Sequence, residues 1–173
     1  MTVDLTPRLL MPSLDQLESV LSNLMNTKVL GDRLRKGAPM PDLFLAGLYH
    51  DQDDLLRAVI RVDFAFALDC GARLSMIPVG VIAEARAAGQ LTEAMADNVY
   101  EILNIFGLLF NEQRPGAPRV RLVEVVDINA LPEQAQELLA NPKAHGVDAT
   151  ITWAKEEATG FVSVRVLTAA PSE

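Results

Sequence analysis

The sequence of residues 97–111, DNVYEILNIFGLLFN, constrains the fold more than any other stretch of this chain. It is a nearly continuous apolar run that is interrupted by Asp97, Glu101 and Asn104. At about 100° per residue these three side chains fall within roughly 60° of one another on a helical wheel, and apolar side chains occupy the rest of the circumference. The segment is therefore predicted to be a helix, capped by Thr92, that is buried on most of its surface and opens to solvent along one narrow polar stripe.

The stripe carries an excess of negative charge. Glu93, Asp97 and Glu101 follow one another at i,i+4, where each pair of like charges costs roughly 0.2–0.5 kcal/mol. No Lys or Arg occurs between positions 87 and 113, so the stripe has no local counter-ion. The simplest explanation is that every helix on a core has a solvent edge, but a face built only for solubility would mix both signs. Because Leu108 falls on the same stripe, we interpret it as a docking surface for a cationic partner.

Composition limits the class of protein. The 173 residues, 50% of them hydrophobic and 5% aromatic, fit one globular domain over residues 1–173 with a sizeable core. A net charge of −8 makes nucleic acid and an anionic membrane surface poor partners, because both attract positive charge. The single cysteine, Cys70, cannot form an internal disulfide, the N-terminus lacks a signal-peptide pattern, and no apolar run is long enough to span a membrane. We expect a cytoplasmic protein.

The rest of the chain alternates helical and strand patterns. Ser13 and Gln16 form a capping-box pair, so a helix is predicted to begin at Ser13 and end near Asn26. A turn-rich stretch follows at 31–42. The other predicted elements are strands at 42–50 and 55–68, an apolar segment at 69–90 that finishes as a short helix ending at Gly89, a strand at 119–128, a short helix at 131–142, and strands at 147–156 and 160–170 joined by a turn around Thr159 and Gly160.

This order of elements predicts an α+β fold. A helix followed by a strand pair occurs twice, which favours a degenerate internal duplication with repeats at about 12–68 and 90–168. The β character of Val59, Val62, Phe64 and Phe66 supports the strand assigned to residues 55–68. The expected architecture is an antiparallel sheet flanked by long helices.

Other candidate sites are weaker. His50 and the acids that follow it in HDQDD could bind a metal ion, but a polar turn between two strands explains the stretch better, so no metal site is predicted. Cys70 is interpreted as a packed small hydrophobe rather than a nucleophile, and Trp153 as a core residue. His145 is placed in a loop. Because neither histidine lies near a motif Ser or Cys, a catalytic triad has no support.

The spacing Asp97-x-x-x-Glu101-x-x-Asn104 resembles the signature of the CheC/CheX/FliY family of chemotaxis phosphatases. That signature is Asp or Ser, three residues, Glu, two residues and Asn on one helix. Ile105 and Gly107 are also similar to the residues that follow the family's Asn. The resemblance implies a CheC-like pseudo-duplicated fold, which the repeated helix and strand pair match.

Members of that family dephosphorylate a CheY-type response regulator. The resemblance implies that Glu101 engages a lysine of the regulator and that Asn104 orients a water for attack on its phosphoaspartate. Glu93, Asp97 and Leu108 would be partner-binding residues. The expected partner is a CheY-like response regulator that carries its own Mg²⁺, so this chain is expected to need no cofactor. An acyl phosphate is already activated, and the phosphatase need only place the water.

The chain departs from the family's pattern in two places. A Pro about two dozen residues after the Asn is absent from positions 126–129, and Pro115, Pro118 and Pro132 lie too early or too late. In the first predicted helix Asn23 is present, but Val20 stands where the motif requires Glu. A single site in the second half is similar to CheX, whose members pair, so a homodimer is expected from the resemblance alone.

Three interpretations remain open. The chain is a response-regulator phosphatase, a catalytically silent CheC-like response-regulator-binding or scaffold module such as the middle domain of the flagellar switch protein, or an unrelated acidic α+β domain. Outward-facing Glu101 and Asn104 favour catalysis, because a scaffold needs neither. The absent Pro favours the scaffold. We prefer the phosphatase. The sequence does not identify the regulator or its pathway.

Overall fold

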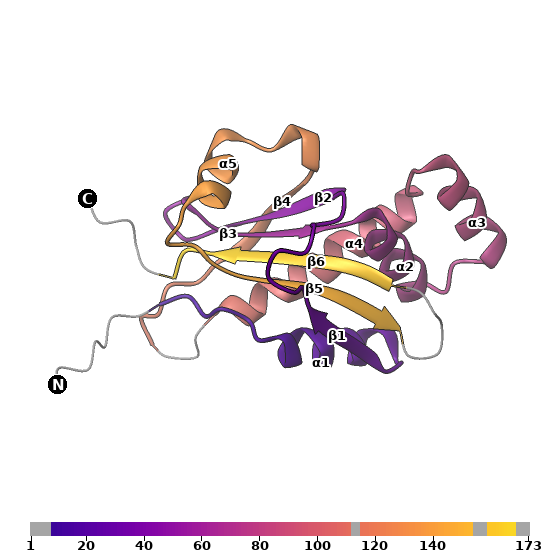
Figure 1. Cartoon of the computed structure of the whole chain (residues 1–173), viewed down its shortest axis with the longest axis horizontal. Helices are drawn as coiled ribbons and strands as arrows, with labels where there is room; N and C mark the ends of the chain where they lie inside the picture. Colours follow the sequence, from indigo (N-terminus) through magenta and orange to yellow (C-terminus); the bar gives the residue numbers. More distant parts are fainter. Residues whose placement is uncertain (1–7, 112–114, 154–158, 169–173) are drawn as a thin grey trace.

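The computed structural model describes residues 8–111, 115–153 and 159–168 and contains a six-stranded antiparallel sheet (Figure 1). The strands are β1 (Val29–Arg33), β2 (Leu45–His50), β3 (Leu56–Val62), β4 (Arg121–Asp127), β5 (His145–Trp153) and β6 (Thr159–Val166). The helices are α1 (Leu14–Met25), α2 (Phe64–Leu74), α3 (Val79–Ala88), α4 (Glu93–Phe106) and α5 (Glu133–Ala140), with short 3₁₀ helices η1 (Gly107–Phe110) and η2 (Ile128–Ala130). The predicted α+β class is confirmed.

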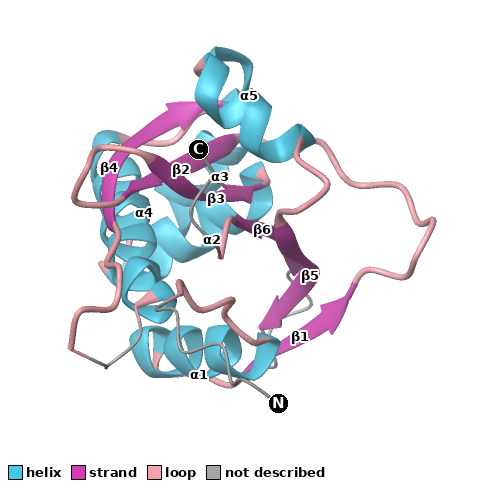
Figure 2. Cartoon of the chain, turned by 90° about the vertical axis from the view of Figure 1, so that its left-hand side faces the viewer, coloured by secondary structure: helices cyan, strands magenta, loops and turns pink. Residues whose placement is uncertain are grey.

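The two faces of the sheet are covered unequally. The main core lies between one face and the helices α1, α2 and α4, whereas α5 packs on part of the other face, over β2 and β3 (Figures 1 and 2). Side chains alternate between the faces along each strand, so Ile60 and Val62 of β3 enter the main core while Val59 packs under α5. Trp153 is buried in the main core, as predicted. No helix in the described ranges is long and apolar enough to cross a membrane.

The sheet has a symmetric strand order, β1-β5-β6-β3-β2-β4. Exchanging β1 with β4, β2 with β5 and β3 with β6 gives the same order read backwards. Each half of the chain therefore supplies a helix, an edge strand and a strand pair, in that order. This topology has the symmetry that the predicted duplication requires, although the boundaries of the two repeats stay a prediction.

The strand β1 was missed by the sequence interpretation, which assigned its last three residues to a turn-rich connection. The strand is short, and Val29 is its one fully buried residue. It pairs with β5, more than a hundred residues away in sequence. Its outward amides are held by α1, because Val29 N donates to Ser22 Oγ at 3.0 Å and Gly31 N donates to Glu18 Oε1 at 2.6 Å. Such long-range pairing leaves no pattern in the local sequence.

The strand prediction for Phe64 and Phe66 was wrong, because both residues lie in α2. Asp63 is the N-cap of this helix, and its Oδ1 accepts a hydrogen bond from Phe66 N at 2.8 Å. The same oxygen accepts from Phe161 N at 2.9 Å, which ties the helix start to β6. The cap and the burial of Phe66 decide the local structure here, against the β propensity of aromatic residues.

Most other predicted elements are present. Ser13 and Gln16 form the predicted capping box, Asn26 ends α1, and Gly89 ends α3. The predicted turn around Thr159 and Gly160 was misplaced, because both residues belong to β6 and the residues just before them lie outside the described ranges. His145 begins β5 and is not in a loop. Cys70 is buried in α2, in agreement with its interpretation as a packed residue.

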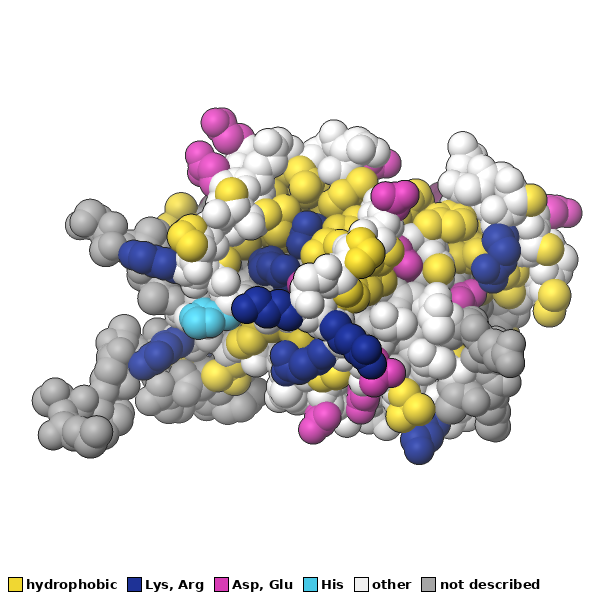
Figure 3. Space-filling view, in the orientation of Figure 1, with side chains coloured by type: hydrophobic (Ala, Val, Ile, Leu, Met, Phe, Trp, Pro, Cys, Tyr) yellow, Lys and Arg dark blue, Asp and Glu magenta, His cyan; other side chains and the backbone are white. Residues whose placement is uncertain are grey.

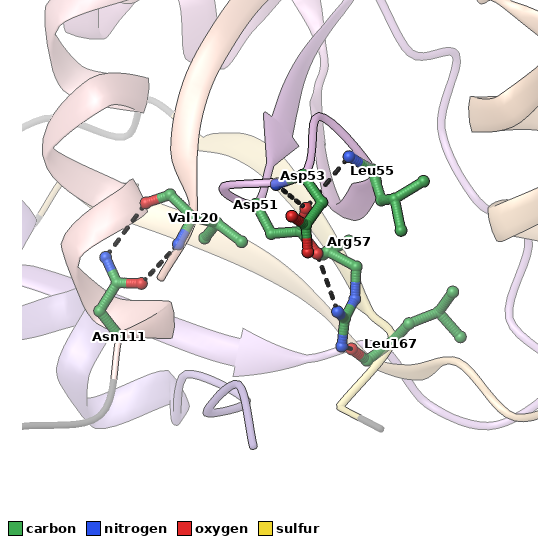
Figure 4. A network of polar contacts seen from close by, with 7 residues as sticks. All are labelled: Asp51, Asp53, Leu55, Arg57, Asn111, Val120 and Leu167. Atoms are coloured by element: carbon green, nitrogen blue, oxygen red, sulfur yellow. Dashed lines mark hydrogen bonds and ion pairs between the residues drawn. The ribbon is translucent and has the colours of Figure 1, made fainter. Parts of the chain in front are cut away.

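The turn HDQDD is organised around a buried ion pair (Figure 4). Asp51 Oδ1 accepts from the amides of Asp53 and Leu55 at 2.9 and 3.1 Å, while Oδ2 contacts Arg57 Nη1 at 3.0 Å. The side chains of Asp51 and Arg57 are only 5% and 7% exposed. Arg57 also donates to Leu167 O at 3.3 Å, so the pair joins the β2–β3 turn to the end of β6. The described residues contain no group of acids, His or Cys that could hold a metal ion.

Asp51→Ala should destabilise the protein by about 3 kcal/mol or more, because it leaves the Arg57 charge buried without its partner. Urea denaturation would measure the loss. The matched control is Asp53→Ala, which removes an exposed carboxylate from the same turn and should change the free energy of unfolding by less than about 0.5 kcal/mol. Equal effects of the two substitutions would contradict this role for the ion pair.

Candidate functional site

The polar stripe of α4 lies on the molecular surface. Glu93, Asp97, Glu101 and Asn104 are all exposed, and the wheel prediction for them is confirmed. Leu108 belongs to η1, which continues the chain from α4 in a tighter turn, and it is 68% exposed. The structure therefore brings all five sequence-predicted site residues onto one continuous helical segment, and what they do stays a prediction.

The opposite side of α4 is buried. Met95, Val99, Ile102, Leu103 and Phe106 pack inward at helical spacing. Thr92 caps the start, as predicted, by accepting a hydrogen bond from Met95 N at 3.3 Å. This division into a buried side and a polar edge explains why the polar residues interrupt the apolar run where they do.

Contacts with α2 fix one flank of α4. Asn98 Nδ2 donates to Gly71 O at 2.7 Å and to Ser75 Oγ at 2.8 Å. The two helices approach closely because α2 carries a glycine here: a Cβ on Gly71 would lie 2.7 Å from Met95 O. The sequence interpretation gave Asn98 no role, because nothing in its spacing separates a helix-pinning amide from a solvent-facing one.

A buried tyrosine holds the C-terminal half of α4 to the sheet. The Tyr49 hydroxyl, on β2, donates to Leu103 O at 2.7 Å. Burial raises the pKa of Tyr49 well above its usual value, so this hydroxyl keeps its proton and remains a donor. Gly107 lets the helix lie against the tyrosine ring, since a Cβ there would approach Tyr49 Cε1 to 3.2 Å. Leu103 is two residues from Glu101, so this hydrogen bond holds the helix backbone to the sheet at the position of the stripe.

Asn111 fastens the far end of η1 (Figure 4). Its Oδ1 accepts from Val120 N at 2.8 Å, and its Nδ2 donates to Val120 O and Gly107 O, each at 3.2 Å. Although Asn111 ends the apolar run, its amide points into this network and does not extend the exposed stripe. Asn111 thus couples the end of the helix to the residue that precedes β4.

No ion pair between described residues gives the stripe a cation. The ion pairs among described residues join Arg57 to Asp51, Arg86 to Asp69, Arg121 to Asp54 and Arg165 to Asp148. None of them involves Glu93, Asp97 or Glu101. The Asn104 amide likewise forms no side-chain hydrogen bond with any described part of the chain, so both its donors and its acceptor are available to solvent or a partner.

The stripe lines none of the hollows found among the described residues. A hollow of about 450 Å³ lies elsewhere, between α2 and α3, and is lined by residues such as Ala72, Ile77 and Ile82. None of its lining residues belongs to the stripe. A small-molecule substrate is usually enclosed in a pocket, so an exposed carboxylate and amide on a rigid helix are better suited to a protein partner.

Asn111→Ala should lower the free energy of unfolding by about 2 kcal/mol, because it leaves the Val120 amide without its hydrogen-bond acceptor. The matched control is Asn104→Ala, which removes an exposed amide without internal partners and should change stability by less than about 0.5 kcal/mol. Urea denaturation of both variants checks the difference. If Asn111→Ala were as stable as the wild type, the network would not be what fastens η1.

No protein-family model matches the chain, and no protein of curated function is similar to it in sequence. Solved structures do share its fold. The FliM middle domain from H. pylori superposes with a TM-score of 0.59 at 12% identity, over 88% of this chain and 84% of that one. The match to a FliG–FliM complex from H. pylori has a TM-score of 0.54 at 13% identity and covers 90% of this chain and 87% of that one.

A CheX–CheY–BeF₃–Mg²⁺ complex from Borrelia burgdorferi is also similar, with a TM-score of 0.43 at 11% identity over 88% of this chain and 94% of that one. The chain therefore has the fold of the FliM middle domains, and the predicted antiparallel sheet flanked by helices is confirmed. At these identities the similarity establishes the fold alone.

Proposed function

We propose that this chain binds a CheY-type response regulator through the stripe of α4 and hydrolyses the regulator's aspartyl phosphate. The observation that carries the proposal is the pair Glu101 and Asn104, which lie one helical turn apart, face solvent and have no partner among the described residues. Because α4 is pinned by Asn98, Tyr49 and Asn111, the pair is presented on a rigid support.

The proposed hydrolysis requires few catalytic groups from this chain. An in-line water forms the new P–O bond as the bond between phosphorus and the aspartyl oxygen breaks. The regulator's aspartate leaves as a carboxylate, and the proton of the water goes to the released inorganic phosphate. A side-chain amide that accepts one hydrogen bond from the water and donates beside it fixes the direction of attack. Neither group of the Asn104 amide is hydrogen-bonded to a residue within 8–111, 115–153 or 159–168, so both are open to this role.

Glu101 is assigned the docking role. It lies between Asp97 and Asn104 on the stripe, so an ammonium group that pairs with it would lie beside the attacking water. The adjacent carboxylates of Glu93 and Asp97 raise the negative potential of this edge and attract a cationic surface. Leu108 adds an exposed apolar contact at the end of the stripe. The Mg²⁺ that serves the reaction is expected on the regulator.

A scaffold function is the second candidate. FliM domains superpose on this chain with TM-scores above 0.5, and one of them is described in a complex with FliG. Fold similarity alone fits a module that binds proteins without chemistry, and the homodimer expected from the resemblance suits either candidate. The exposed Asn104 favours the phosphatase over the scaffold, because a scaffold gains nothing from an unpartnered amide at that position.

Asn104→Ala should abolish catalysed dephosphorylation while leaving the affinity for the regulator nearly unchanged, because it removes the water-orienting group but no charge. The measurement is the decay of a phosphorylated CheY-type receiver with Mg²⁺ present and this chain at a few per cent of its concentration. The wild type should accelerate decay through many turnovers. If every phosphorylated receiver in a panel decayed at its spontaneous rate, including receivers that bind this chain, catalysis would be ruled out and the scaffold function would remain.

Glu101→Lys should instead weaken binding, since it places like charge against the partner's lysine and such contacts cost several kcal/mol. The matched control is Glu84→Lys on α3, which makes the same change of charge at an exposed site outside the stripe. Titration calorimetry at two salt concentrations would measure both affinities. Equal loss in the two variants would show that net charge, and not the stripe, governs binding.

A further inference from the structure

The face of the sheet opposite the main core carries a concentration of positive charge in a protein whose net charge is −8. Figure 3 shows Lys and Arg side chains gathered across the middle of this face. Along β3 and β6, Ile60, Val62 and Val164 point into the main core, so Arg61, Ser163 and Arg165 point to the other side. Together with Asp148 of β5, these three residues form what we call the Arg61 cluster.

Arg165 is fully neutralised within the cluster. Its Nη1 and Nη2 donate to Asp148 Oδ1 and Oδ2, each at 2.8 Å, in a bidentate pair. The guanidinium lies over Gly146, where a Cβ would come within 2.5 Å of Nη1. Burial raises the pKa of Asp148, but the hydrogen bonds from Arg165 and Ser163 and the charges of Arg165 and Arg61 together hold the pKa below its usual value. The Asp148 carboxylate is therefore ionised and already paired with Arg165.

Arg61 has no such partner. Its Nη2 donates to Ser163 Oγ at 2.8 Å, its Nε is buried without a hydrogen-bond acceptor, and no carboxylate within the described ranges lies at ion-pair distance. Burial lowers the pKa of Arg61, the charge of Arg165 lowers it further, and Asp148 opposes both. The cluster thus keeps one uncompensated positive charge, half-buried between strands, at a place where an unpaired charge is costly.

The β1–β2 connection adds charge next to the cluster. Leu34 N donates to Asp148 O at 2.8 Å, so the connection leaves the sheet beside the cluster and crosses the same face (Figures 1 and 2). Its next residues, Arg35 and Lys36, are exposed. An opposing acid, Asp32, lies across from Thr150 on the outer strand. The net charge around the Arg61 cluster is therefore positive.

We propose that the Arg61 cluster is a docking site for a short acidic segment of a partner protein, with one carboxylate of that segment bound by Arg61 and its neighbours facing Arg35 and Lys36. A planar carboxylate matches the fork of a guanidinium, and it supplies the missing counter-charge. The site lies on the face of the sheet away from α4, so it is independent of the function proposed for the stripe.

The expected occupant is a peptide rather than a nucleic acid. One uncompensated guanidinium and two exposed cations neutralise only a few negative charges, whereas a polyanion needs many phosphate contacts to release enough counterions. The net charge of −8 also repels a long polyanion more than a short segment. Charge complementarity therefore selects an acidic peptide.

The test is fluorescence anisotropy of a fluorescein-labelled hexaglutamate peptide titrated with the full chain. Arg61→Gln should weaken binding by about tenfold, because the central charge pair is lost. The control, Arg119→Gln, makes the same change of net charge at an exposed residue before β4 and should stay within about twofold of the wild type. In the wild type itself, the Nε–H resonance of Arg61 should move on addition of the peptide, a readout that needs no variant.

Three outcomes would overturn the proposal. The first is absence of peptide binding to the wild type, or equal binding by Arg61→Gln with an unmoved Arg61 resonance. The second is tighter binding of a labelled hexauridylate RNA than of the peptide. The third is self-association of the wild type, measured by sedimentation, that Arg61→Gln abolishes, because the occupant would then be a second copy of this chain.

Discussion

The hydrogen bond from the Tyr49 hydroxyl to the Leu103 carbonyl holds the surface of this protein to its core. It fixes α4 on the sheet at the level of the stripe, and Asn98 and Asn111 hold the helix on either side of it. Three separate elements, β2, α2 and the residues before β4, thereby set the position of one helix. The backbone that carries the exposed carboxylate and amide is thereby held in place, which is a condition for positioning a single water.

The strand order determines where α4 lies in the fold. Because the order is symmetric under exchange of the two halves, α1 and α4 have equivalent places in the topology, each preceding an edge strand. The chain uses them differently. On α1, Glu18 and Ser22 hold the amides of β1, so its polar side chains serve the sheet edge. On α4 the corresponding carboxylates pair with no residue in the described part of the chain. One fold thus contains a structural helix and a helix whose polar residues face outward.

Local signals in the sequence predicted much of this. The caps at Ser13 and Thr92, the stop at Gly89 and the exposed stripe were all read from residues close in the chain. What the sequence could not show depends on distant residues: β1 is a strand only because β5 pairs with it, and Phe66 is helical because Asp63 caps it while bonding Phe161. The Arg61 cluster was missed for the same reason, since its members come from three strands.

We propose that the α4 stripe is the surface that meets a response regulator. Amide chemical-shift mapping of the ¹⁵N-labelled chain with a phosphorylated CheY-type receiver tests it most directly, because it locates contact residue by residue in the unaltered protein. We predict that the resonances of Glu101, Asn104 and Leu108 shift on binding and that those of Arg61 and Ser163 do not. Binding that shifts the Arg61 cluster and leaves α4 unmoved would contradict the account.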